Sequence, residues 1–293
     1  MKDVDFFLIK NVWKSSANGI QVDDSTISNI HDNTISSFHK RGIRYINSNG
    51  KFYDNEVIGD SVDGTNRVQN LVNLWGGSNV EIYENKLHNA LTNPEGTPTW
   101  DSPGIFVSSY GGSSNSDAYI HDNEIYDCDS GIVITSVCAE IDTSSATINN
   151  NNLHNLENAI IFEKTTGSAV ISGNTFTNNI NNFDPSINIG DTYYGGIQYA
   201  IDNANSGDTV YVSPGLYNER ITINKPLTLR GATYNINKNG YEVPENYEWD
   251  TSVESVINNP EPALSTSQVV DIVSDDIVFV GFVAFFVSRK KRY

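Results

Sequence analysis

I-H-D-N-E-I, at residues 120–125, decides the fold of this chain because the same phrase recurs with small changes. The other copies begin at residues 30, 52, 82, 148 and 171. Each copy runs apolar, two polar residues, Asn, any residue, apolar. Six copies within residues 30–176 predict a stacked repeat rather than a conventional globular domain.

A second phrase precedes each copy and reads as a strand. Its forms are G-I-Q-V at 19–22, G-I-R-Y at 42–45, L-V-N-L at 71–74, G-I-F-V at 104–107, G-I-V-I at 131–134 and A-I-I-F at 159–162. Alternation with a period of two predicts strands with one face turned inward. The strand starts (Ile20, Ile43, Val72, Ile105, Ile132, Ile160) lie 23 to 33 residues apart, which fits one coil of three strands and three turns.

The invariant asparagine of the first phrase is expected at a corner of the coil. Asparagine tolerates left-handed backbone angles and can bond neighbouring backbone groups. Identical side chains stacked in successive coils can also bond one another. We therefore interpret these residues as a structural ladder: Asn33, Asn55, Asn85, Asn123, Asn151 and Asn174.

The repeat resembles the right-handed parallel β-helix of the pectin-lyase-like superfamily over roughly residues 17–190. The resemblance is to its NosD-like branch and to archaeal disaggregatase-related surface proteins. W-G-G-S-N-V-E-I-Y-E-N-K-L-H-N-A-L at 75–91 and T-W-D-S-P-G-I-F-V at 99–107 carry the second likeness. It implies an all-β, right-handed parallel β-helix solenoid of about six coils. It implies no catalytic motif that can be matched here.

Near Gly190 the repeat stops, which predicts a first domain at 1–190 and a second at 191–293. Ile197, Ala200, Ile201 and Ala204 have helical spacing, and strands are expected at 209–212, 221–223 and 227–229. This part resembles the short capping helix and first coils of a second, incomplete β-helix module. Residues 277–287, before a basic end, could begin a membrane anchor, but they fall short of the roughly 20 residues required. An altered coil is the preferred interpretation.

The acidic composition limits the partners. The formal net charge is −18, which argues against a nucleic-acid partner and suits a secreted or surface protein. Residues 1–16 hold no signal peptide, so we expect a fragment of a longer exported protein, with a cytoplasmic protein as the alternative. Cys128 and Cys138 are expected as two buried thiols rather than a disulfide.

Long insertions point to a candidate groove. They fall at 58–70, 88–103, 108–118 and 136–146, on both sides of the G-I-x-V strands. Alternation places Arg44, Asn73, Trp75 and Phe106 outward in one sugar-sized neighbourhood, with Trp100, Asp101 and Tyr110 from the flanking loops. Arg44 and Asp101 are the candidate catalytic residues, and the others are candidate substrate-binding residues. The alternative is that Trp75 and Phe106 pack under their own loops.

Charged residues add two further expectations. Lys40, Arg41, Arg44, Lys51 and Arg67 form a basic cluster in an acidic chain, suited to uronate or sulfate groups. Glu95, Asp101 and Asp117 could supply a carboxylate pair for glycoside hydrolysis. The histidines do not have metal-ligand spacing. His88 and His154 share an outward column with Tyr126 between them, as surface stacking residues. No metal and no cofactor are expected.

These observations favour an extracellular or cell-surface β-helix protein that binds, and could cleave, an acidic polysaccharide or cell-envelope glycan. If it is an enzyme, it is expected to be a polysaccharide lyase or glycoside hydrolase. One alternative is a non-catalytic structural or adhesive surface-layer module. The other is a NosD-like periplasmic accessory protein, although the lack of Met and His clusters argues against copper binding.

Overall fold

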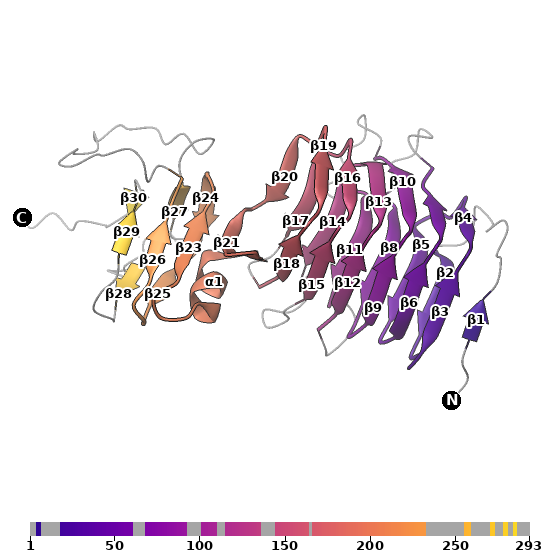
Figure 1. Ribbon diagram of the computed structural model, residues 1–293, viewed down its shortest axis with the longest axis horizontal. Coiled ribbons are helices and arrows are strands. Elements are labelled where there is room, and N and C mark those ends of the chain that lie inside the picture. Colours follow the sequence, from indigo (N-terminus) through magenta and orange to yellow (C-terminus); the bar gives the residue numbers. More distant parts are fainter. Residues whose placement is uncertain are drawn as a thin grey trace, which may run out of the picture. The chain divides into compact units, whose positions relative to one another are not determined.

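A computed structural model describes most of the chain, which divides into two compact units, Met1–Asp184 and Pro185–Tyr293 (Figure 1). The described residues are 4–6, 18–60, 68–92, 101–109, 115–135, 144–163, 166–232, 255–258, 270–272, 278–280 and 284–285. The first unit ends six residues before the expected boundary at residue 190.

The first unit is a solenoid of three parallel sheets, and each coil contributes one strand to each sheet. Sheet A holds β1(Val4–Phe6), β3(Ser28–His31), β6(Asn49–Tyr53), β9(Asn79–Tyr83), β12(Asp117–His121), β15(Ser145–Asn149) and β18(Ser168–Ser172). Sheet B holds β2(Asn18–Asp23), β5(Arg41–Ile46), β8(Asn70–Trp75), β11(Pro103–Ser108), β14(Ser130–Thr135), β17(Asn158–Phe162) and β20(Asn181–Asp184). Sheet C holds β4(Thr34–Ser36), β7(Glu56–Ile58), β10(Lys86–Ala90), β13(Glu124–Cys128), β16(Asn152–His154) and β19(Thr175–Thr177).

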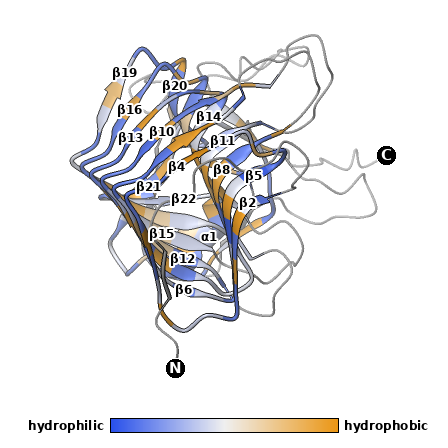
Figure 2. Cartoon of the chain, turned by 90° about the vertical axis from the view of Figure 1, so that its right-hand side faces the viewer, coloured by the Kyte–Doolittle hydropathy of each residue, from blue (hydrophilic) through white to orange (hydrophobic). Residues whose placement is uncertain are grey.

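The register of sheet B is the one that the period-two alternation predicts. Ile20 pairs with Ile43, Ile43 with Val72, and the column continues through Ile105, Ile132 and Ile160. All six side chains are buried, so each coil stacks apolar residues on those of the next. Figure 2 shows apolar colour within the strands and polar colour at the corners. Burial of each such side chain contributes about 1.5–3 kcal/mol.

Glycine begins several of these strands because the backbone of the next coil lies too close for a side chain. A Cβ at Gly42 would lie 2.5 Å from the carbonyl oxygen of Leu71. At Gly131 the same distance to the carbonyl oxygen of Ala159 is also 2.5 Å. The G-I-x-V form of the phrase therefore records a close approach of consecutive coils at the corner that precedes sheet B.

The ladder asparagines lie at the corner between sheets A and C, and all of them except Asn174 are buried. Each side-chain amide donates to the side-chain oxygen of the next asparagine, as from Asn55 to Asn85 at 3.1 Å. The left-handed backbone conformation lies one residue earlier than expected. Positive φ angles are found at Asp32, Asp54, Glu84, Asp122, Asn150 and Gly173, each immediately before a ladder asparagine. The asparagine is thus conserved through the coils for its side-chain bonds and not for its backbone angles.

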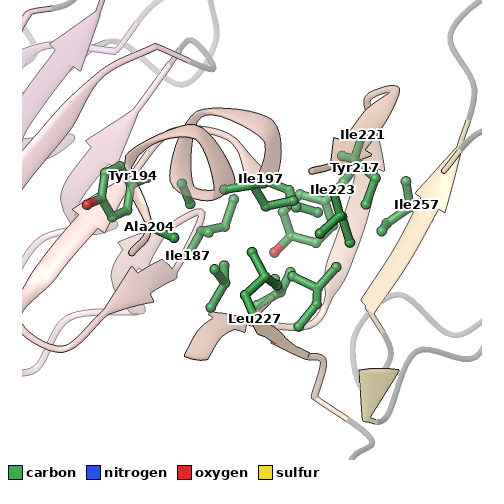
Figure 3. Close-up of a cluster of buried hydrophobic side chains, with 14 residues drawn as sticks. Ile187, Tyr194, Ile197, Ala204, Tyr217, Ile221, Ile223, Leu227 and Ile257 are labelled. Atoms are coloured by element: carbon green, nitrogen blue, oxygen red, sulfur yellow. The ribbon is translucent and has the colours of Figure 1, made fainter. Parts of the chain in front are cut away.

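The second unit packs a short helix on strands. Its elements are β21(Ile187–Ile189), β22(Thr192–Tyr194), α1(Ile197–Asn203), β23(Thr209–Val212), β24(Gly215–Asn218), β25(Ile221–Ile223), β26(Thr228–Arg230), β27(Ser255–Asn258), β28(Val270–Ile272), β29(Val278–Val280) and β30(Ala284–Phe285). β21 and β22 form an antiparallel hairpin, which the sequence did not predict. The later strands pair in parallel: β23–β26–β29, β24–β27–β30 and β25–β28. Figure 3 shows Ile197 of the helix among the buried apolar side chains of these strands.

Side chains from the segments on either side of β25 hold both ends of α1. The N-cap residue Gly196 supplies no side-chain cap, and the carboxylate of Glu219 instead accepts the backbone N–H groups of Ile197 and Gln198, at 2.9 and 3.0 Å. At the other end, the Lys225 ammonium donates to the carbonyl oxygens of Asp202 and Ala204. The expected capping helix is therefore anchored to the first coil beneath it.

The region proposed as either an anchor or an altered coil contains strands where it is described. β29 pairs with β26, and β30 pairs with β27. The other residues of 277–293 lie outside the described residues. In the described part of the chain, no helix combines the length and the apolar character needed to cross a membrane.

Candidate functional site

The outer face of sheet B carries the columns on which the candidate groove was expected. The register aligns Gln21, Arg44, Asn73, Phe106, Val133 and Ile161 in one column. A second column aligns Asp23, Ile46 and Trp75, and Ser108 with Thr135. Neighbouring strands of a sheet lie about 4.8 Å apart. Arg44, Asn73, Trp75 and Phe106 therefore lie close together, as the alternation predicts.

Most of this face is covered rather than open. Asn73, Ser108 and Thr135 are fully buried although they point outward, and Val133 is also buried. Arg44, Trp75 and Phe106 are half-buried, whereas Gln21 and Asp23 are exposed. The middle of the face is thus covered, whereas accessible residues lie in its first coils and again at its far end, where Glu163 and Asp184 are exposed. Asn73 is beneath this surface, so it does not offer the open binding position that the sequence suggested.

Two arginines, the half-buried Arg44 and the buried Arg41, converge on one indole ring. The guanidinium carbon of Arg44 lies 3.7 Å from the centroid of the Trp75 ring, and that of Arg41 lies 4.7 Å from it. Arg41 also donates to the side-chain oxygen of Asn18 at 3.4 Å. Cation–π contacts of this kind hold a guanidinium against the ring, and a guanidinium is the side-chain group best shaped to bind planar anions. We call Arg41, Arg44 and Trp75 the arginine–tryptophan cluster.

Asp101 does not join this cluster. It lies at the corner before β11 and five residues before Phe106, whose column contains Arg44 two coils away. Its carboxylate accepts a hydrogen bond from the Ser130 hydroxyl, at 2.9 Å, in the next coil. The structure therefore does not bring the two candidate catalytic residues together.

A polar network occupies the corner that precedes sheet B. The Asp129 carboxylate accepts the backbone N–H groups of Thr92 and Ser102, both at 3.0 Å, and the Thr92 hydroxyl. The Ser102 hydroxyl lies 3.0 Å from that of Thr92 and accepts the backbone N–H of Gln69. Gln69 in turn accepts the backbone N–H of Asp60. The residues on either side of segments 61–67 and 93–100 are thus tied into one network.

Burial raises the pKa of Asp129, and hydrogen bonds from Thr92 and Ser102 offset part of that rise. The sequence did not single out this aspartate. The repeat could have identified its position, because Ser130 is in register with Pro103. Asp129 therefore occupies the same place in its coil as Ser102 does in the preceding coil. Arg41 was recognised only as part of a basic cluster, and its contact with Trp75 was not expected.

Other candidates are dispersed. Lys51 lies on sheet A, where it bonds Glu81 at 2.7 Å, and Asp117 lies on the same sheet, bonded by Ser145. The basic cluster and the carboxylate set are therefore divided between two faces. Lys40 is exposed at the turn before β5. Trp100, Tyr110, Arg67 and Glu95 lie outside the described residues, so the structure does not place them.

Metal-binding chemistry finds no support in the described ranges. They contain no group of three or more His, Cys, Asp or Glu side chains arranged to hold a metal ion. Cys128 is a buried free thiol, and burial raises its pKa to about 12. Cys138 lies outside the described residues. Four of the five histidines, His31, His88, His121 and His154, instead stack with tyrosines on the outer faces of sheets A and C.

Comparison with known proteins agrees with this architecture. A family model described as a right-handed β-helix region matches residues 8–213. No curated protein and no solved structure matches the chain.

Proposed function

Because the chain belongs to the right-handed β-helix family, we propose that its first unit binds an acidic polysaccharide at the arginine–tryptophan cluster. A β-helix of this kind suggests a polysaccharide-related or surface protein. The observation that carries the finer proposal is the convergence of Arg41 and Arg44 on Trp75, with ring-centroid distances of 4.7 and 3.7 Å.

The chemistry of the cluster suits a uronate. Guanidinium groups bind carboxylates through two parallel hydrogen bonds, and an indole adds apolar area for the face of a sugar ring. The local positive charge stands out in a chain of net charge −18. An acidic glycan would be repelled by most of the surface and attracted here, so the cluster also determines where the chain is bound.

Binding without cleavage is the form of the proposal that the geometry favours. The Asp101 carboxylate accepts a hydrogen bond from Ser130, so the two candidate catalytic residues, Arg44 and Asp101, do not form one site. We place the protein outside the cell or at its surface, where such glycans are found. A structural or adhesive module is the second candidate, and it is favoured by the burial of Asn73, Ser108 and Thr135 on the same face.

Titration of the full chain with a polyuronate, beside a neutral glycan of similar length, tests the proposal. The wild-type protein should bind only the polyuronate, with affinity that falls as salt is added. Arg44→Ala should weaken binding about tenfold or more, since a charge-assisted hydrogen bond contributes about 1.5–3 kcal/mol.

Arg230→Ala is the matched control. Arg230 also lies over an aromatic ring, that of Tyr211, at 5.6 Å, but in the second unit. Its loss should leave affinity unchanged. Equal losses for the two variants, or no binding of any acidic glycan, would favour the structural module. Release of unsaturated products would show that the protein is a lyase, and release of new reducing ends without them would show that it is a hydrolase.

A further inference from the structure

Two stacks of rings run along the outside of the first unit, and each joins consecutive coils. On sheet A the rings of His31, Tyr53, Tyr83 and His121 are stacked at centroid distances of 4.7, 4.9 and 5.0 Å. On sheet C the rings of His88, Tyr126 and His154 are stacked at 4.8 and 4.8 Å. We call these the sheet A stack and the sheet C stack.

Three of the histidines also contact a glutamate from the preceding coil. The Nε2 atoms of His88, His121 and His154 lie 3.1, 3.3 and 3.2 Å from the carboxylates of Glu56, Glu81 and Glu124, respectively. In each pair the histidine lies two residues beyond the position in register with the glutamate. The same diagonal contact therefore recurs at three successive junctions between coils.

His121 shows which protonation state the arrangement fits. Its Nδ1 atom lies 2.7 Å from the Asp122 carboxylate, while its Nε2 atom faces Glu81. A neutral imidazole carries one N–H group and one acceptor nitrogen, so it can donate to only one of two carboxylates. The imidazolium carries two N–H groups and donates to both.

We propose that protonation of His88, His121 and His154 ties successive coils together, so that the solenoid is more stable in mildly acidic than in alkaline solution. A charge-assisted bond is roughly twice as strong as a neutral one, and an imidazolium gains further attraction from the stacked tyrosine ring. In a solenoid each coil contacts only its neighbours, so three strengthened junctions in a row stabilise the whole stack.

The other charged groups around these histidines allow this response. Lys51 holds the second oxygen of Glu81 at 2.7 Å and, with His121, keeps the pKa of Glu81 below its ordinary value. The lowered pKa keeps Glu81 ionised in mildly acidic solution. The phenol rings of Tyr83 and Tyr119 also lie against His121, and Asn149 is its register partner in the next coil.

Sheet C offers similar surroundings. His88 faces Glu56 and Tyr126, with Lys86 4.0 Å from the same oxygen of Glu56. His154 faces Glu124 and Tyr126. The imidazolium gains these partners only in the folded chain. These contacts therefore favour the folded chain more in mildly acidic than in alkaline solution.

Thermal unfolding of the full chain at about pH 5.5 and at about pH 8 tests the proposal. The wild-type Tm should be higher at the lower pH by about 2 °C or more. The triple variant His88→Gln, His121→Gln, His154→Gln should lose most of that difference. His39→Gln is the control, because His39 is exposed and belongs to neither stack. This variant measures how much of the Tm difference arises only because a protonated histidine reduces the net negative charge of the chain.

A second variant keeps the test decisive if the triple variant is poorly folded. Glu81→Gln retains every histidine and the side-chain shape but removes one carboxylate, and it should reduce the pH-dependent difference in Tm. The proposal is overturned if the histidine variants and Glu81→Gln keep the full wild-type difference, or if His39→Gln reduces it equally.

Discussion

The side-chain amide of Asn123 donates a hydrogen bond to the side-chain oxygen of Asn151, 2.9 Å away and one coil further along the solenoid. The same oxygen accepts the backbone N–H of Asn123 at 3.0 Å. Asn123 also donates to the carbonyl oxygen of Ile82 in the preceding coil, at 2.8 Å. One buried side chain therefore satisfies groups in three coils, which makes the corner as dependent on polar contacts as the interior is on apolar ones.

Replacing Asn123 with Ala should be strongly destabilising. It removes the acceptor of the backbone N–H and side-chain amide of Asn85, and it removes the donor to Ile82. Each buried group left without a partner costs about 1–3 kcal/mol, so we expect a loss of about 3 kcal/mol. Urea unfolding measures it. Asn152→Ala, at an exposed neighbouring position, should change stability by less than about 0.5 kcal/mol; equal losses would contradict the ladder's role.

Arg44→Lys should separate charge from geometry at the arginine–tryptophan cluster. Lysine keeps the positive charge but lacks the planar guanidinium that lies 3.7 Å from the Trp75 ring and binds carboxylates in two places. We expect polyuronate affinity to fall several-fold while the Tm is unchanged. Calorimetric titration measures the first and circular dichroism the second. An unchanged affinity would mean that charge alone attracts the glycan.

Asp129→Ala should loosen the polar corner before sheet B. It leaves the backbone N–H groups of Thr92 and Ser102 and the Thr92 hydroxyl without their acceptor. We expect a loss of about 2–4 kcal/mol in the free energy of unfolding. Asp129→Asn should cost less because it retains one acceptor oxygen. Asp117→Ala removes only an exposed contact with Ser145 and should be nearly neutral; a comparable loss there would show that the network has no special importance.

Glu219 predicts a pH response confined to the second unit. Burial raises its pKa above the ordinary 4.5, and the N–H groups of Gln198 and Ile197 only partly offset this. The folded state thus disfavours the ionised form, so stability around α1 is greatest below pH 4.5 and declines as pH rises through the raised value. Hydrogen exchange of the Ile197 and Gln198 amides, corrected for intrinsic rates, should show this decline. Glu219→Gln should remove the slope, and a slope that persists would assign it to another group.

The sequence could predict the columns of the solenoid because two regularities act together. Alternation determines which residues face inward, and one strand per coil determines which residues become neighbours, so Arg44, Asn73 and Phe106 could be aligned without coordinates. The helix at Ile197–Asn203 was also predicted, from the spacing of its apolar residues. Both outcomes depend on backbone periodicity, which a sequence displays directly.

Side-chain direction and cover could not be predicted in the same way. Asp101 was expected beside Arg44, yet it lies at the corner before β11, where its carboxylate accepts the hydroxyl of Ser130 in the next coil. Asn73 points outward and is nevertheless buried. The left-handed residue was assigned one position too late, because asparagine suits both the backbone angle and the hydrogen-bonded role, and the sequence alone does not separate them. The hairpin β21–β22 was missed because Gly190 was interpreted only as the end of the repeat.

The asparagine ladder has no preferred length. Each interior member accepts a hydrogen bond from the asparagine of the preceding coil and donates one to the asparagine of the next coil. From Asn33 to Asn151 the donor and acceptor atoms are the same at every step. Removing or duplicating one whole coil would rejoin equivalent partners and leave no interior group unmatched, whereas losing part of a coil would break the series. Such a scaffold can gain or lose whole coils. The insertions that give each coil its individual surface can also be exchanged while the contacts between coils stay the same.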